Sequence, residues 1–225
     1  RWCPREARAA SSPCPLTTRS RCSTTGAPGA GGQGGDNKIF TRRSTDAGLI
    51  FGPEVQVADL LSTTTNGDLG LAGGFRTNSF PHAAVNPVNG DLYVVYNDNP
   101  ADADNADVFY VKSRNHGATW SAPVQVNNAD SARDQFMPTV AVATDGTNLM
   151  FGYYSRANDG VLFHRQGRKG TINTTTGAVA LKPSFQLGPD TPVVLGQDPV
   201  VNATYMGDYD QIAPTPGFFH STWAD

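Results

Sequence analysis

Glutamate is the rarest charged residue in this chain of 225 residues. It occurs only at Glu6 and Glu54, whereas the other 18 acidic residues are aspartate. Glutamate favours helices, while aspartate favours turns and caps because its short side chain bonds nearby backbone N–H groups. Together with 24 glycines and 16 prolines, this composition predicts an all-β protein with many turns.

Long hydrophobic runs and an excess of basic charge are also missing. No apolar run approaches the roughly 20 residues that a helix needs to span a bilayer, so we expect no membrane span. Residues 36–225 carry 12 Lys or Arg against 19 Asp or Glu, a net charge of −7. Because nucleic-acid affinity rests largely on Lys and Arg, this balance argues against a nucleic-acid partner.

Cysteine is confined to the first 22 residues, at Cys3, Cys14 and Cys22. An odd number beside a cysteine-free body gives no disulfide framework. Residues 1–35 are rich in Arg, Ser, Pro and Gly without any period, which predicts a disordered leader or linker. The stretch lacks the apolar centre of a signal peptide. The chain begins with Arg, so we expect a fragment; a mis-framed segment would give a similar pattern.

From residue 36 onward, short strands follow one another at spacings that indicate a sandwich, barrel or propeller. A repeat favours the propeller. The stretch 76–98 can be laid on 133–156 at an offset of 57 residues, so that Arg76 matches Arg133 and Pro81 matches Pro138. Self-similarity on this scale, with four short strands per unit, is typical of propeller blades.

The repeat predicts about two and a half to three blades. One spans about 79–127, with strands at 81–86, 91–97, 107–113 and 123–127. The preceding blade contributes two strands within 38–57, and the following blade spans about 137–188. A fourth begins near "YMGDYDQIA" and stops inside "FFHSTWAD". A propeller typically needs four to eight blades to close.

Two short stretches share one pattern, S-x-[D/N]-x-G-x-[T/I]-[W/F]. They are "STDAGLIF" and "SRNHGATW". The Ser hydroxyl and the Asp or Asn side chain can bond backbone groups in a tight turn, glycine supplies a positive φ, and the aromatic residue can anchor the turn in the blade. The residues with these roles are Ser44, Asp46, Gly48 and Phe51 in the first copy, and Ser113, Asn115, Gly117 and Trp120 in the second.

Through these turns the sequence resembles the sialidase superfamily, in which the motif is called the Asp-box or bacterial neuraminidase repeat. Asn115 replaces the usual Asp in the second copy, and Ile50 replaces the usual Thr in the first. The resemblance covers about 36–225. It implies a sialidase-like β-propeller of six or seven blades, Asp-boxes on the outer rim away from the central cleft, and an extracellular location.

Sialidases hold the carboxylate of sialic acid with three arginines and cleave with a tyrosine nucleophile, its glutamate partner and an aspartic acid. On that pattern, the candidates for substrate binding are Arg76, Arg133 and Arg156. The catalytic candidates are Tyr205, with Tyr209 as the alternative, for the nucleophile, and Asp208, with Asp210 as the alternative, for the acid. The structural alternatives are arginines bound to carbonyls of a neighbouring blade, buried tyrosines, and an ordinary turn in "GDYD".

Two departures from the pattern leave the catalytic set incomplete. Glu54 follows an Asp-box on a predicted outer strand, where it is poorly placed to activate a tyrosine. The family's strand entry, Arg followed by an apolar residue and Pro, is replaced by "FRTNSFP". Two functions therefore stay open: a sialidase-related glycoside hydrolase acting on glycan-linked sialic acid or a similar sugar, and a non-catalytic secreted propeller that binds glycan or protein.

An Asp-rich loop is the one metal candidate. Asp98, Asp102, Asp104 and Asp107 lie within ten residues, and calcium takes six to eight oxygen ligands. The spacing does not fit an EF-hand, and a solvated hairpin loop is the alternative. The sequence indicates no other cofactor, and it leaves the oligomeric state open.

Overall fold

The computed structural model describes residues 17–22, 37–61, 69–99, 104–127, 133–156, 160–195, 204, 207 and 209–224. Within these ranges the regular elements are all β-strands, arranged in four antiparallel sheets. The described part of the chain has no helix with the length and apolarity that crossing a membrane requires. The predicted all-β class is confirmed.

The second sheet corresponds to the blade predicted at 79–127. Its strands, in spatial order, are β4 (His82–Val85), β5 (Leu92–Asp98), β6 (Asp107–Ser113) and β7 (Val124–Gln125). Each strand begins and ends within two residues of its predicted position. The prediction succeeds because valine and aromatic residues concentrate in these runs, while Asn, Pro, Gly and Asp separate them.

The third sheet corresponds to the blade predicted at 137–188 and also has four strands. They are β8 (Gln135–Val142), β9 (Asn148–Arg156), β10 (Phe163–Ile172) and β11 (Val179–Gln186), with β8 and β11 at the two edges. The β8–β9 register shifts between Phe136 and Thr139, where Met137 has a φ of 47°. This irregularity is a bulge that turns the backbone locally out of the ladder.

The two remaining sheets are smaller. The first contains β1 (Thr17–Cys22), β2 (Asn37–Arg42) and β3 (Val55–Asp59), and the last contains β12 (Gln211–Thr215) and β13 (Phe218–Thr222). Strand β1 pairs with β2 along its whole length. The boundary at residue 36 between a leader and a propeller stays a prediction, because most of 1–35 lies outside the described residues.

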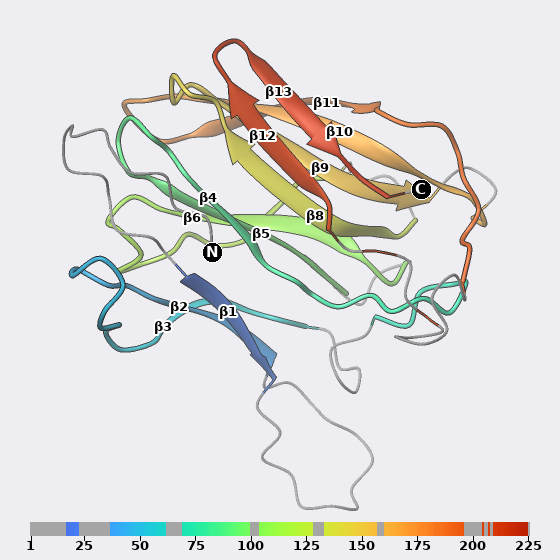
Figure 1. Cartoon of the computed structure of the whole chain (residues 1–225), viewed down its shortest axis with the longest axis horizontal. Coiled ribbons are helices and arrows are strands. Elements are labelled where there is room, and N and C mark those ends of the chain that lie inside the picture. Colours follow the sequence, from blue (N-terminus) through green and yellow to red (C-terminus); the bar gives the residue numbers. More distant parts are fainter. Residues whose placement is uncertain are drawn as a thin grey trace, which may run out of the picture.

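The sheets stack face to face in chain order, from β1–β3 through β4–β7 and β8–β11 to β12–β13 (Figure 1). Strands β5 and β8 are buried along their entire length because both faces of their sheets are covered. The largest core lies between the second and third sheets and includes Tyr93, Tyr110 and Phe151. A second core, around Ile39, Val94 and Tyr96, joins the first sheet to the second.

Because neighbouring strands are antiparallel, the connections gather at two ends of the stack. At one, which we call the turn end, are the connections from β2 to β3, β4 to β5, β6 to β7, β8 to β9 and β10 to β11. At the other, the loop end, β3, β5, β7, β9 and β11 finish, while β4, β6, β8, β10 and β12 begin. Contacts between sheets keep the ends aligned: at the turn end, the Asn86 amide donates to the carbonyl of Gly146 at 2.9 Å.

Candidate functional site

The first aromatic-ended turn connects β2 to β3 and is held by the side chains of Ser44 and Asp46. Ser44 Oγ donates to Asp46 Oδ1 at 2.5 Å and accepts the backbone N–H of Gly48 at 2.9 Å. Asp46 Oδ1 also accepts the N–H of Ile50 at 2.9 Å. These donors, the Ser44 hydroxyl first, lower the pKa of the Asp46 carboxyl. Gly48 has a φ of 89°, which a side chain would strain.

The second turn, between β6 and β7, repeats this geometry with asparagine in place of aspartate. Ser113 Oγ lies 2.9 Å from Asn115 Oδ1 and accepts the N–H of Gly117 at 2.9 Å. Asn115 Oδ1 accepts the N–H of Thr119 at 2.9 Å, and its Nδ2 donates to the Thr119 hydroxyl at 2.8 Å. The turn therefore needs an acceptor oxygen at this position, not a negative charge. Phe51 and Trp120 are both partly buried, and Trp120 packs against the core around Ile39.

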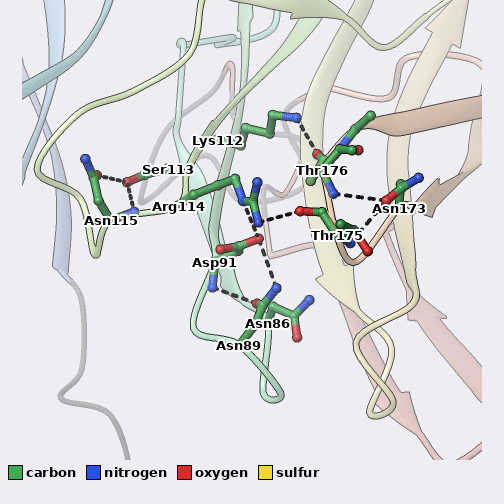
Figure 2. Close-up of polar contacts among 12 residues, drawn as sticks. Asn86, Asn89, Asp91, Lys112, Ser113, Arg114, Asn115, Asn173, Thr175 and Thr176 are labelled. Atoms are coloured by element: carbon green, nitrogen blue, oxygen red, sulfur yellow. Dashed lines mark hydrogen bonds and ion pairs between the residues drawn. The ribbon is translucent and has the colours of Figure 1, made fainter.

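Polar contacts at the turn end join the second sheet to the third (Figure 2). The Arg114 guanidinium lies 3.6 Å from the Asp91 carboxylate and donates to the carbonyl of Thr175 at 3.2 Å. Lys112 Nζ donates to the carbonyl of Gly177. These contacts occupy the side chains that flank the second turn, so this part of the turn end is structural.

Arg76 and Arg133 both lie at the loop end, one before β4 and the other before β8. Both side chains are partly buried. The Arg76 guanidinium carbon lies 5.9 Å from the centre of the Phe80 ring, and the Arg76 backbone N–H donates to the carbonyl of Thr204 at 3.0 Å. The repeat thus places two arginines at equivalent entries of successive sheets. Their binding of substrate stays a prediction.

Arg156, the third predicted substrate ligand, ends β9 at the same loop end, and its side chain is only 3 % exposed. Its guanidinium donates to the carbonyls of Val161, at 2.9 Å, and of Ala72. It lies 3.8 Å from the Asp134 carboxylate and over the rings of Phe75 and Phe136, at 5.5 and 5.8 Å. These contacts hold the segment before β4 against the third sheet.

Asp210, a candidate acid from the sequence, belongs instead to a buried cluster at the loop end with Tyr154 and Arg165, which sequence reasoning missed. Arg165 is 1 % exposed; its Nη1 donates to the carbonyl of Met137 at 3.1 Å and lies 3.4 Å from Asp210 Oδ2. The Tyr154 hydroxyl lies 3.0 Å from Asp210 Oδ1 and 2.6 Å from the carbonyl of Ala224. The bulge at Met137 turns that carbonyl toward the guanidinium. The cluster therefore attaches the last sheet and residues 223–224 to the third sheet.

Electrostatics in this cluster favour a structural role. Burial, with the Asp210 carboxylate second, raises the pKa of the Tyr154 hydroxyl well above its usual value. A tyrosine in this state is a poor source of phenolate. Burial lowers the pKa of the Arg165 guanidinium, and the charge of Asp210 opposes that shift. Strand alternation could have revealed Arg165, because residues two apart share a face and Phe163 is an obvious core residue.

The catalytic candidates Tyr205 and Asp208 lie outside the described residues, so their roles stay predictions. Among the described residues around them, Thr204 is exposed and Gly207 is partly buried. Tyr209 is 83 % exposed, whereas Asp210 is 3 % exposed and belongs to the buried cluster. Asp210 immediately precedes β12, which starts at the loop end, and the carbonyl of Thr204 accepts the N–H of Arg76 at 3.0 Å, so these two described residues lie at the same end as Arg76 and Arg133.

The described members of the Asp-rich loop accept hydrogen bonds from within the loop and from distant residues. The Asp98 oxygens accept the N–H groups of Leu61 and Asn99, at 2.7 and 2.9 Å. Asp104 accepts the N–H of Ala106 at 3.2 Å, and Asp107 accepts from the Asn127 amide at 2.5 Å. Among the described residues no group of three or more His, Cys, Asp or Glu could hold a metal ion. Asp102 lies outside them, so calcium binding stays a prediction.

No protein-family model matches the chain, and no curated protein matches it by sequence. Solved structures do. An alpha-L-arabinanase from Penicillium chrysogenum in complex with arabinobiose matches with a TM-score of 0.53 and 16% identity, over 79% of this chain and 47% of that one. The GH93 alpha-L-arabinofuranosidase of Fusarium graminearum matches with a TM-score of 0.51 and 17% identity, over the same shares. "Hadza microbial sialidase Hz136" matches with a TM-score of 0.47 and 14% identity, over 81% and 35%.

At these identities the similarity shows the fold. The chain has the propeller fold of glycoside hydrolases of this kind, as predicted. It spans less than half the length of the structures it matches. Fold alone does not assign activity, because one scaffold serves many functions.

Proposed function

We propose that this chain forms part of a glycoside hydrolase of sialidase type, with its site at the loop end. Its substrate is a glycan-linked sialic acid or a similar carboxylated sugar. The observation that carries the proposal is the pair Arg76 and Arg133, two partly buried cations at equivalent entries of successive sheets. Guanidinium groups bind carboxylates through two parallel hydrogen bonds, which gives both affinity and orientation.

In this proposal Tyr205 attacks the anomeric carbon while Asp208 protonates the departing glycosidic oxygen, and water then releases the sugar from the tyrosine. Thr204, whose carbonyl accepts the N–H of Arg76 at 3.0 Å, and Asp210, which precedes β12 at the loop end, support a common site with the arginines. Arg156 serves as a positioning residue, because its guanidinium already contacts two carbonyls and Asp134. An extracellular location, where glycoconjugates are exposed, belongs to the same proposal.

A second function, a secreted propeller that binds glycan or protein without cleaving it, is favoured by the position of Glu54. Glu54 lies at the turn end, where its carboxylate contacts Arg42 at 3.0 Å. It is therefore remote from the loop end, where a sialidase-type tyrosine requires a glutamate partner. The two functions differ in turnover, and the second has a glycan or a protein as its ligand.

The test is hydrolysis of a fluorogenic α-sialoside, with a fluorogenic α-L-arabinofuranoside in parallel and circular dichroism to verify folding. We expect sialoside turnover, and a loss of roughly 30- to 150-fold in kcat/KM for Arg76→Ala and Arg133→Ala. That range corresponds to about 2–3 kcal/mol for a charge-assisted contact. Arg42→Ala, which removes an exposed arginine at the turn end, is the matched control and should keep full activity.

Four other outcomes would contradict the proposal. Turnover of the arabinofuranoside alone would show that the substrate is a neutral sugar and not a carboxylated one. Binding of sialyllactose by the folded protein without turnover would establish the second function. Neither binding nor turnover, or turnover that survives both arginine substitutions, would refute a sialidase-type site at the loop end.

A further inference from the structure

The turn between β10 and β11 contains the tripeptide Asn173-Thr174-Thr175. It fits the pattern Asn-x-Ser/Thr, with x any residue except Pro, which is the acceptor for N-linked glycans. The only other such tripeptide in the chain is Asn202-Ala203-Thr204, whose asparagine lies outside the described residues. Because an N-linked glycan is bulky and belongs on a surface, an acceptor site must present the asparagine amide nitrogen and the hydroxyl to solvent.

The first tripeptide meets this requirement, because Asn173, Thr174 and Thr175 are all exposed. The backbone N–H groups of Thr175 and Thr176 donate to Asn173 Oδ1 at 3.1 and 3.0 Å. Within the described part of the chain, neither the Asn173 amide nitrogen nor the Thr175 hydroxyl has a hydrogen-bond partner. The two bonds to the oxygen therefore fix the orientation of the carboxamide and leave its nitrogen available.

The turn is closed by hydrogen bonds among its own residues. The N–H of Asn173 donates to the carbonyl of Ala178 at 2.8 Å, and the N–H of Gly177 donates to the carbonyl of Asn173 at 2.7 Å. The N–H of Ala178 donates to the Thr176 hydroxyl at 3.2 Å. Because all these partners lie within 173–178, the turn can form on a nascent chain before the sheets associate.

Two cations from the second sheet contact one side of the turn, and Asn173 lies on the other side (Figure 2). Arg114 donates to the carbonyl of Thr175 at 3.2 Å, and Lys112 donates to the carbonyl of Gly177. Both acceptors are backbone atoms, so these contacts hold the turn without using the Thr175 hydroxyl or the Asn173 side chain. A glycan on Asn173 would therefore extend into solvent without displacing either cation.

We propose that Asn173 is an N-glycosylation site. A transferase joins the Asn173 amide nitrogen to the anomeric carbon of an oligosaccharide that is carried on a lipid diphosphate. The bond between that carbon and the diphosphate oxygen breaks, the lipid diphosphate leaves, and the amide nitrogen gives one proton to a base of the transferase. The inference rests on the extracellular location within the proposed function, because exported chains receive this modification. The glycan lies at the turn end, so it leaves the loop end open to substrate.

The test is secretion of the intact chain from yeast behind a cleavable signal peptide, followed by enzymatic removal of N-glycans in H₂¹⁸O and peptide mass spectrometry. The enzyme converts each occupied asparagine to an aspartate that carries ¹⁸O, so occupancy is read at single residues. We expect the label at Asn173 in most molecules. Thr175→Ala should abolish it, whereas Thr175→Ser should retain it because serine also supplies the hydroxyl. Thr174→Ala, at the middle position of the tripeptide, is the matched control and should be occupied as in the wild type.

Removal of the glycan from the folded protein tests the exposure of the site. Without denaturant, the enzyme should release the glycan completely and leave the circular dichroism spectrum unchanged, because Asn173 is exposed. A glycan released only after unfolding would overturn the accessible geometry. No label at Asn173 in the secreted chain, or a label that survives Thr175→Ala, would overturn the site itself.

Occupancy of Asn173 and sialoside turnover are independent measurements on the same sample. An occupied chain without turnover would support the glycosylation site and contradict the proposed hydrolase. Turnover by a chain that carries no glycan at Asn173 would do the reverse. Asn173→Gln removes the glycan at the turn end, so it should leave the kcat/KM of an active chain unchanged.

Discussion

At the scale of single residues, Arg165 carries a buried charge, with only 1 % of the residue exposed. Its guanidinium has one carboxylate partner, Asp210, and one carbonyl partner, Met137, and lies 4.9 Å from the centre of the Tyr154 ring. Its Nε and Nη2 have no hydrogen-bond partner, so the group depends heavily on Asp210. Breaking a buried pair is costly because the remaining charge is left uncompensated.

We therefore predict that Arg165→Met lowers the free energy of unfolding by about 3–5 kcal/mol. The double variant Arg165→Met with Asp210→Asn should recover part of this loss, because it removes both charges together. Urea unfolding, monitored by tryptophan fluorescence, measures both variants and gives their coupling energy. A single variant within about 1 kcal/mol of the wild type would show that the pair is solvated.

Sequence reasoning recovers the elements but not the partners of this residue, for a physical reason. Strand positions follow from local composition, such as the valines and aromatics of β5 and the turn residues around Gly90. In "FHRQGRKG" the alternation with Phe163 indicates that Arg165 faces the core, although the charges of the stretch are typical of an exposed strand. Its partner Asp210, 45 residues later, and the bulge at Met137 leave no local pattern.

At the scale of elements, the β8–β9 turn fits tightly against the β4–β5 turn. Gly146 has a φ of 73°, and a Cβ built there would lie 2.5 Å from Asn86 Oδ1 and 2.9 Å from Val88 Cγ2. Asn86 in turn accepts the N–H of Val88 at 2.9 Å and donates to the carbonyl of Gly146. This contact aligns the second and third sheets at the turn end.

Because of this contact, we predict that substituting two glycines of similar backbone geometry lowers the free energy of unfolding by different amounts. Gly217, in the β12–β13 turn, has a φ of 82° and open space around its Cβ position. Gly217→Ala should therefore lower the free energy of unfolding by about 1 kcal/mol, through backbone strain alone. Gly146→Ala should lower it by at least about 2 kcal/mol, since it adds a steric clash and displaces Asn86.

Thermal or urea unfolding of the two variants measures both losses of stability. Because the backbone strain is common to both, the difference between the losses gives the contribution of the contact between the sheets. Equal losses would mean that the β4–β5 turn moves away from the added methyl group without cost. In that case Asn86 would not align the sheets.

At the scale of the whole molecule, the position of each sheet in the stack determines how fully it is buried. The second and third sheets have a core on both faces, whereas β13 has Phe218 at 69 % exposure and pairs with β12 alone among the described strands. Stability in such a stack is not uniform, because local opening exposes fewer apolar contacts at its margin.

Amide hydrogen exchange should reveal this gradient. We expect the slowest exchange in β5 and in β8 with β9, and exchange at least tenfold faster in β12 and β13. Mass spectrometry of peptic fragments resolves these segments. Uniform protection across the four sheets would show that the stack opens as a single cooperative unit.

The equivalence of Asp46 and Asn115 also affects how such repeats change over time. Aspartate and asparagine codons differ by one base, and the two turns show that either side chain supplies the acceptor oxygen that the backbone requires. Mutation between them should therefore be nearly neutral for folding, and successive copies can drift apart at this position. A repeat signature that demands aspartate would overlook half of the copies in this chain.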